Sequence, residues 1–443
     1  MKKKTSILLL LLILPFFFIF NIDDRLKNFD DKNLHFHIID NLSKYINFNF
    51  SSSLQKEINF KKKSIYFEQF SNKFLRYRFY LTQTEKKIFL ISKDGAIFYV
   101  PKGNLINKKE IIIKRIKTNL NKIIGKKYIS ENRSIIKGIE IVGDQIFVSF
   151  LANNNSCYSN AIAQGKLNMK HIEFSLLIKL DECKKIFNYS VGGNIVKFKE
   201  NNLLLTTGDF QIPENLKDEF NDQNLKSDKL ETDPQSTSSY YGKILSININ
   251  TKKIKIISMG HRNPQGLFYD DSANIIFSTD HGPKGGDEIN IDVQPTFKKI
   301  KNFGWPKSSY GVRYDEDINF KDQSCENKIL TSLAPLCKSH KKFGYIEPAK
   351  YFTPSIGITQ IIKIKNNNKN VHELIIASMG YHKHEDDMTI HKVDLDSFFG
   401  VINYEKYYVG ERIRDVIQIN DQYFFLALES APAPSLGLVK FRN

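Results

Sequence analysis

The chain has 443 residues, 41% of them hydrophobic and 12% aromatic. That composition is enough to bury a large core and excludes a disordered or fibrous protein. The formal net charge is +17, a value that raises nucleic acid or an anionic surface as a partner. The lysines are scattered and no zinc-finger, RNP or helix-turn-helix signature accompanies them, so we expect no nucleic acid partner.

The N-terminus has the pattern of an export signal. Three lysines directly after the first methionine precede an apolar run from Ile7 to Phe20. A basic start with a run of this length fits a signal sequence better than a full membrane span. No small-x-small cleavage site follows. Residues 1–23 are therefore predicted to be a signal peptide or an uncleaved anchor, with membrane attachment through residues 5–22. The body is then expected to be periplasmic, secreted or anchored to the outer face of the inner membrane.

The four cysteines form two pairs that are local in sequence, Cys157 with Cys183 and Cys325 with Cys337. In an oxidising compartment, disulfides within these pairs are the simplest of the three connectivities. Four buried thiols are the alternative. None of the cysteines has the CxxC spacing of a zinc or redox site, so no metal is predicted there.

Residues 24–64 show no clear period and are interpreted as a lead-in segment. From residue 65 onward one pattern recurs: a hydrophobic run, a turn of Asp, Asn or Gly, and a second hydrophobic run. This pattern is typical of a β-hairpin. It occurs six times, at residues 88–100, 139–150, 195–205, 267–277, 361–376 and 416–426.

Six hairpins with hardly a helical period between them predict a radial all-β array. A single hairpin is too small to bury its own face, whereas sheets around an axis cover one another and leave few exposed edges. The predicted fold is one domain over residues 65–443, an all-β, six-bladed β-propeller of four-stranded antiparallel blades. A pair of large β-sandwiches is the alternative. Residues 211–239 are predicted to be an insertion loop.

The stretch from Gly260 to Glu288 gathers the residues that carry chemistry. Four polar side chains fall within five positions: His261, Arg262, Asn263 and Gln265. A proline and a glycine interrupt any regular element there, so these side chains can point together into a cleft. Residues 282–288 hold three glycines, a proline and two carboxylates, which suits a backbone folded tightly around a hard cation. Two polar surface turns are the alternative.

These motifs resemble the glucose/sorbosone dehydrogenase family. The resemblance covers roughly residues 65–443 and rests on G-H-R-N-P-Q-G-L, T-D-H-G-P-K-G-G-D-E, N-F-G-W-P, E-P-A-K-Y-F-T-P-S and R-I-R-D-V, which begin at residues 260, 279, 302, 347 and 412. It implies a six-bladed propeller and a soluble or periplasmic sugar dehydrogenase that depends on pyrroloquinoline quinone (PQQ).

The resemblance also implies a set of site residues. Arg262 and Asn263 match family residues that contact the quinone, and Gln265 is expected to join them. Arg412 and Arg414 match a pair that binds the carboxylates of the quinone, and their i, i+2 spacing on a strand predicts a shared face. The alternative is a surface strand with ordinary salt bridges. Gly282 and Pro283 match positions whose backbone carbonyls bind calcium (Ca2+). Asp287 and Glu288 lie nearby and are not assigned as ligands.

The chain departs from the family pattern at several positions. Ser190 stands where the general-base His is expected, and a serine accepts no proton near neutral pH without a base of its own. Gly380 stands where a quinone-contacting Lys is expected, and Lys383 is its candidate replacement. Three further departures are Asn194 in place of an Arg, Phe352 in place of a Trp, and Phe210 at a position that is polar in glucose-oxidising members.

Two functions are therefore predicted as alternatives. In the first, an exported quinoprotein dehydrogenase oxidises a sugar or other alcohol and passes electrons to a periplasmic acceptor. Calcium and Arg262 polarise its quinone, and His261 replaces the missing base, with His382 and His384 as further candidates. In the second, the propeller has lost catalysis and binds a carbohydrate, another ligand or a protein partner. The His-rich run 381–388 suggests a transition-metal site, with a solvated loop as the alternative.

Overall fold

The computed structural model describes residues 48–72, 78–106, 108–126, 128, 135–155, 157–184, 190–210, 233–283, 285–311, 340–365, 370–380, 387–429 and 435–442. The chain divides into two compact units, Met1–Asn47 and Phe48–Asn443, and every described residue belongs to the second. The predicted signal or anchor segment lies outside the described residues, as do residues 211–232 of the predicted insertion loop. Within the described part, no helix combines the length and apolarity needed to cross a membrane.

Regular structure in these residues is almost entirely β-strand, arranged in five sheets. The largest sheet has ten strands. Its hydrogen-bonded order is β25 (Ile413–Gln418), β26 (Tyr423–Leu428), β27 (Ser435–Arg442), β2 (Lys63–Ser71), β1 (Phe48–Phe60), β6 (Glu110–Thr118), β5 (Ile97–Pro101), β4 (Lys87–Ser92) and β3 (Phe79–Gln83), with β10 (His171–Ile172) beside β6.

Each of the other four sheets is built mainly from strands that follow one another along the chain. The first is β7 (Ile136–Val142), β8 (Gln145–Asn154), β9 (Cys157–Lys166) and β11 (Phe174–Lys179). The second is β12 (Gly192–Phe198), β13 (Asn202–Thr207), β14 (Lys243–Asn248), β15 (Ile254–Met259) and β19 (Lys301–Asn302). The third is β16 (Pro264–Asp270), β17 (Ile275–Asp280), β18 (Asp287–Val293) and β20 (Lys350–Phe352). The fourth is β21 (Ile358–Lys363), β22 (His372–Ser378), β23 (Thr389–Leu395) and β24 (Val401–Tyr408).

Pairing within the sheets is antiparallel with two exceptions. The two-residue strand β10 pairs in parallel with β6, and the two-residue strand β19 pairs in parallel with β15. The helical elements with bounds in the described residues are short: η2 (Lys102–Asn104), α3 (Leu120–Ile124), η5 (Asp233–Gln235) and η7 (Lys341–Phe343). The all-β prediction is confirmed.

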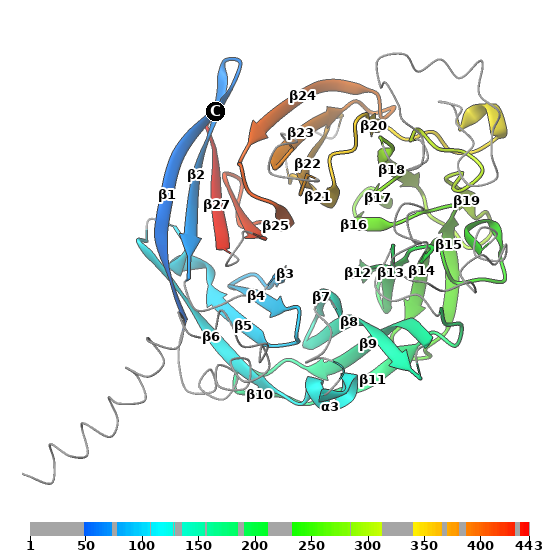
Figure 1. Ribbon diagram of the computed structural model, residues 1–443, viewed down its shortest axis with the longest axis horizontal. Helices are drawn as coiled ribbons and strands as arrows, with labels where there is room; N and C mark the ends of the chain where they lie inside the picture. Colours follow the sequence, from blue (N-terminus) through cyan, green and yellow to red (C-terminus); the bar gives the residue numbers. More distant parts are fainter. Residues whose placement is uncertain are drawn as a thin grey trace, which may run out of the picture. The chain divides into compact units, whose positions relative to one another are not determined.

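The sheets follow one another around a common centre (Figure 1). β3 contacts β7, and the contacts continue through β12, β16, β21 and β25 until β25 contacts β3 again. The strands in this closed circle are those nearest the centre of the view. A circle of this kind is propeller-like, and it does not fit the alternative of two packed β-sandwiches.

The core consists of separate clusters that lie between neighbouring sheets. In one cluster Phe89 of β4 packs with Ile139 and Val148 of the β7–β8 hairpin. In the next, Phe147 packs with Leu205 of β13. A strand that is covered on both faces does not alternate between buried and exposed residues. In β17 all six residues are buried, including the polar Ser278, Thr279 and Asp280.

Each of the six predicted hairpins forms in the structure. The start of the β structure differs from the prediction, because β1 begins at Phe48, inside the predicted lead-in segment 24–64. β1 pairs with β2 on one side and β6 on the other, and β2 pairs with the C-terminal strand β27. The first strands of this unit therefore join its two ends in a single sheet.

Candidate functional site

The motif stretch Gly260–Glu288 supplies two loops at one end of the sheet that contains β16–β18. Pro264 at the start of β16 pairs with Asp280 at the end of β17. The loop before Pro264 and the loop after Asp280 therefore lie side by side. Asp280 joins them, since its carboxylate accepts the backbone N–H of Asn263 at 2.7 Å and that of Arg262 at 3.2 Å.

His261 is completely buried beneath these loops. Its Nε2 lies 2.8 Å from the hydroxyl of Ser258, its Nδ1 lies 3.2 Å from Asp280, and its ring stacks on Phe303 at 4.9 Å between centroids. Both ring nitrogens are engaged, and His261 is not among the described residues that line the cavity beside these loops. We therefore assign His261 a role in positioning the loop, and not the role of proton acceptor.

Arg262 holds the second loop. Its Nη1 donates to the carbonyls of His281 and Gly282, each at 2.8 Å. Its guanidinium carbon lies 5.6 Å from the centre of the Trp305 ring, a cation–π distance. Arg262 thus lies against the turn that the sequence assigns to calcium.

The glycine-rich turn is folded as tightly as its composition predicts. A Cβ on Gly282 would fall 1.9 Å from the carbonyl oxygen of Gly286. Asp287 fixes the turn through one carboxylate oxygen, which accepts the N–H of Gly282 at 3.1 Å and lies 2.7 Å from Nδ1 of His281. Burial raises the pKa of Asp287, but the His281 charge and the hydrogen bonds outweigh burial and hold that pKa below its usual range.

Two neutral carbonyls are the oxygen donors that this turn offers to a hard cation. Gly282 O accepts Arg262, and Pro283 O accepts the N–H of Gly286 at 3.0 Å and the hydroxyl of Ser355 at 3.1 Å. Among the described residues, no group of three or more His, Cys, Asp or Glu side chains could hold a metal. The turn therefore fits calcium only if the bound ligand contributes oxygens of its own.

A cavity of about 240 Å³ lies beside these loops and is lined from several sheets. Its polar lining includes Ser190, Asn263, Gln265 and His281, which the motifs brought forward. Four basic residues also line it: Arg78, Lys93, Lys137 and Arg414. The acidic residue in the described lining is Glu429. A cavity with this excess of positive charge suits an anionic ligand.

Glu429 is buried among three arginines. Arg414 donates to it directly, Nε of Arg78 lies 3.3 Å from its Oε2, and Nε of Arg412 lies 4.0 Å from the same oxygen. Burial raises the pKa of Glu429, but the arginines outweigh burial and hold that pKa below its usual range. One carboxylate thus orders the cationic wall of the cavity.

Arg412 and Arg414 both approach Glu429, but they differ in their other contacts. Arg414 lines the cavity, whereas Nη1 of Arg412 donates to the carbonyls of Gly380 at 2.7 Å and Met379 at 3.2 Å. The pairing register of β25 with β26 shifts between Ile413 and Asp415. A β-bulge of this kind breaks the alternation of side chains along a strand.

The departures from the family pattern lie in different surroundings. Ser190 lines the cavity, whereas Phe210 is fully buried against Tyr241, with ring centroids 4.8 Å apart. Asn194 donates to the carbonyl of Gln265 at 2.9 Å. Phe352 is buried in the core between two sheets. Lys383, His382 and His384 lie outside the described residues.

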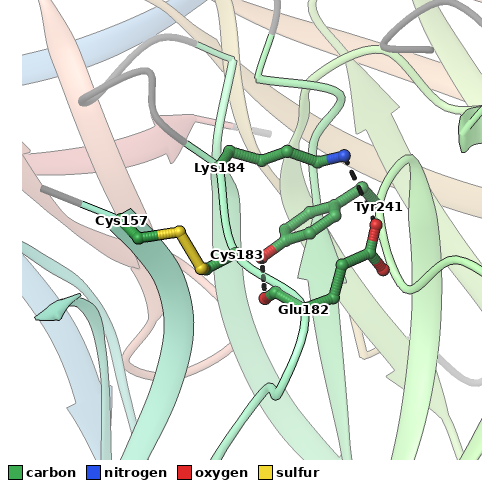
Figure 2. Close-up of a disulfide and its surroundings, with 5 residues drawn as sticks. All are labelled: Cys157, Glu182, Cys183, Lys184 and Tyr241. Atoms are coloured by element: carbon green, nitrogen blue, oxygen red, sulfur yellow. Dashed lines mark hydrogen bonds and ion pairs between the residues drawn. A yellow bond between two sulfur atoms is a disulfide. The ribbon is translucent and has the colours of Figure 1, made fainter.

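The predicted disulfide Cys157–Cys183 is present, and Figure 2 shows its surroundings. Next to Cys183, the backbone carbonyl of Glu182 accepts the hydroxyl of Tyr241 at 2.5 Å, and Nζ of Lys184 lies 4.8 Å from the centre of the Tyr241 ring. The bridge fixes the chain shortly before Ser190. The predicted pair Cys325–Cys337 lies outside the described residues.

Comparison with known proteins agrees with this fold and these motifs. The model of the glucose / sorbosone dehydrogenase family matches residues 141–436, so the chain belongs to that family. Over 78 residues it is 44% identical to an aldose sugar dehydrogenase of Escherichia coli, covering 18% of this chain and 19% of that protein. Over 108 residues it is 32% identical to quinoprotein glucose dehydrogenase B of Acinetobacter calcoaceticus, covering 22% and 21%. The matches thus span about a fifth of each relative.

Similarity to solved structures extends much further along the chain. The apo form of the soluble aldose sugar dehydrogenase of Escherichia coli superposes with a TM-score of 0.59, covering 85% of this chain and 99% of that one. The sequence identity over that superposition is 17%, so this likeness shows the fold alone.

Proposed function

We propose that this protein is an exported quinoprotein dehydrogenase that oxidises a sugar or other alcohol with PQQ and calcium. The observation that carries the proposal is the cationic cavity beside the two motif loops, because PQQ is a planar tricarboxylate that needs cations and flat hydrogen-bond donors. Membership of the glucose/sorbosone dehydrogenase family and the name of the Acinetobacter relative support the choice of cofactor.

The architecture we propose is a six-bladed propeller. The ten-stranded sheet divides into β25–β26–β27–β2 and β6–β5–β4–β3, with β1 joining the two groups. These two groups and the four remaining sheets make six blades. In this architecture the first strand of each blade is the one nearest the axis. The cavity lies where these first strands begin and where loops from several blades meet.

We assign the following roles to the residues of the cavity and of the loops beside it. Arg414, together with Asn263 and Gln265, binds and orients the carboxylates and carbonyls of the cofactor. The carbonyls of Gly282 and Pro283 hold calcium, with Arg262 fixing their turn. When bound, the quinone supplies a two-electron acceptor and calcium a Lewis acid. Arg412 contributes by fixing the loop at Met379–Gly380.

Export and location belong to the same proposal. The basic and apolar start of the chain supports a signal peptide or membrane anchor, and the Cys157–Cys183 bridge suits an oxidising compartment. We propose a periplasmic, secreted or outer-face location, with a periplasmic electron acceptor and a small sugar or alcohol as substrate.

Reconstitution of the purified full chain tests the proposal. PQQ binding is measured by calorimetry with and without calcium, and dye reduction is measured on a panel of aldoses and alcohols. The Arg414→Gln variant should weaken PQQ binding at least tenfold, whereas Arg442→Gln, which removes an exposed arginine from the surface pair with Glu57, should not. Absence of PQQ binding overturns the proposal. Binding without turnover of any substrate leaves a ligand-binding propeller.

A further inference from the structure

The first strands of five sheets share an irregularity near the cavity. Their pairing with the second strand shifts register at Ile136/Gly138, Gly192/Ile195, Pro264/Gly266, Ile358/Ile361 and Ile413/Asp415. A bulge redirects the side chain of its extra residue. Lys137, Gln265 and Arg414 are extra residues in three of these bulges, and all three line the cavity. Lys137 is therefore the structural equivalent, in the β7–β8 hairpin, of two residues already expected to bind the cofactor.

The neighbouring strand makes room for Lys137. Gly193 lies in the bulge of β12 with φ +103°, and a Cβ there would fall 2.4 Å from Cβ of Lys137 and 2.7 Å from its Cγ. This glycine is held from both sides, since its N–H donates to Oγ1 of Thr206 at 3.1 Å and its carbonyl accepts the hydroxyl of Ser149. The stem of Lys137 thus lies against a fixed backbone at Gly193, three residues beyond Ser190.

Lys137 is buried, and titratable groups from other elements line the same cavity: Arg78 before β3, Tyr80 on β3, Lys93 after β4, His281 after β17, Arg414 on β25 and Glu429 after β26. Burial, and then the charges of Arg414 and Arg78, lower the pKa of Lys137 to about 7, while Glu429 raises it. A lysine tuned to this range accepts protons near neutral pH.

Two of the other groups are poorly suited to that task. Glu429 is held by arginines, and its lowered pKa makes it a weak base. Burial raises the pKa of Tyr80, so its hydroxyl stays protonated. His281 lies 2.7 Å from Asp287 through one ring nitrogen, and it serves below as the comparison residue.

We infer that Lys137 accepts the hydroxyl proton of the substrate, an inference that rests on the proposed function. The O–H bond of the alcohol breaks, and a new N–H bond forms on the neutral amine of Lys137. The C–H bond of the carbon that carries this hydroxyl also breaks, and its hydrogen leaves with both electrons to the oxidant, a quinone. A carbon–oxygen double bond forms. The alcohol carbon is oxidised by two electrons, the oxidant is reduced by two, and Lys137 later returns its proton to solvent.

The first test needs no cofactor. The full chain is labelled with [13Cε]lysine and titrated by NMR, alone and as Lys137→Met. We expect one resonance that titrates near pH 7 to be absent from the variant. Lys243 is an internal reference, because the pKa of this lysine is also lowered to about 7, chiefly by burial, and its resonance should remain in the variant. If the missing resonance titrates above pH 10, the inference is overturned whatever the protein's activity.

The second test uses the PQQ- and calcium-loaded chain. Lys137→Met keeps the stem over Gly193 and should lower kcat by about 10²- to 10⁴-fold with PQQ affinity changed less than threefold. The rise of kcat/KM with pH near 7 should disappear. Small alkylamines should restore activity to Lys137→Ala, in proportion to their basicity. His281→Gln should keep the pH-dependent rise.

Other results count against Lys137 as the base. Full activity in Lys137→Met, loss of activity through weaker PQQ binding alone, or disappearance of the pH-dependent rise in His281→Gln each overturns the inference. Turnover by the wild type with an active Lys137→Met variant leaves the proposed function standing. If the wild type shows no turnover, both the proposed function and the role of Lys137 are overturned.

Discussion

The backbone N–H of Ile358 donates to Oδ2 of Asp287 over 2.9 Å, which joins the glycine-rich turn after β17 to the start of β21 in the next sheet. The same oxygen accepts the N–H of Ile356 at 3.0 Å. Asp287 is fully buried, and its other oxygen holds Gly282 and His281. One carboxylate therefore connects two adjoining sheets at the proposed calcium turn.

Replacing this carboxylate by an amide should be costly. In Asp287→Asn, an NH2 group faces backbone N–H donors, and each buried donor left unsatisfied costs about 1–3 kcal/mol. We expect a loss of roughly 2–4 kcal/mol in the free energy of unfolding, measured by urea denaturation. Asp396→Asn is the control, since Asp396 accepts the N–H groups of Phe398 and Gly400 in an exposed turn and should lose less than about 1 kcal/mol. Equal losses would contradict this account.

Gly193→Ala should destabilise the protein for two reasons. The φ of Gly193 is +103°, and the new Cβ would meet the stem of Lys137. Gly143→Ala separates these reasons, because Gly143 also has a positive φ (+62°) but no atom within 4 Å of a built Cβ. We expect about 1 kcal/mol of destabilisation for Gly143→Ala and about 1–3 kcal/mol more for Gly193→Ala, from denaturation midpoints. Identical midpoints would mean that Lys137 moves aside freely.

Removing the Cys157–Cys183 bridge should lower stability through the unfolded state. The cysteines are 26 residues apart, and closing a loop of that length is worth about 3–4 kcal/mol in the chain-entropy model. We expect Cys157→Ser/Cys183→Ser to lose about that much in denaturation without reductant. With reductant, the wild type should fall to the level of the double variant. A wild type that keeps its advantage in reductant would show that the bridge is not the cause.

The sequence was sufficient for the hairpins because each has its own hydrophobic runs and turn residues. It was not sufficient for β1, because its residues Phe48–Phe60 are largely polar and exposed. β1 forms a hairpin with β2, and its other partner, β6, is far away in the sequence. No local pattern announces such a strand. The circle of sheets exists only once the ends of the chain have met.

In the candidate site, too, some residues were predicted from the sequence and others were not. Asn263, Gln265 and Arg414 were found from motifs, and they line the cavity. Arg78, Lys137 and Glu429 were missed, because they come from segments far from those motifs. The one local signal was a lysine within the apolar run Ile135–Ile139. His261 was expected to act as the base because it is next to Arg262 in the sequence, but adjacency in sequence does not show whether a side chain is buried. Strand periodicity also gave no sign of the register shift between Ile413 and Asp415, beside Arg414.

Glu429 allows a prediction in which pH is the variable. Arg414 and Arg78 lie against its carboxylate, so Glu429→Gln leaves buried positive charge uncompensated. Breaking a buried pair by removing one partner costs about 3–5 kcal/mol, and we expect a loss in that range at pH 7. Glu57→Gln, which breaks the exposed pair with Arg442, should lose less than about 1 kcal/mol.

The loss in Glu429→Gln should shrink in acid. The pKa of Glu429 is lowered in the folded protein, so the carboxylate stabilises the fold fully above the ordinary glutamate value of about 4.3. That stabilisation is lost as the pH falls through the lowered, folded value. Urea denaturation of both proteins from pH 7 down to pH 3 should therefore show the two unfolding free energies converging. A difference that stays constant over this range would mean that Glu429 acts through its shape and hydrogen bonds, and not through its charge.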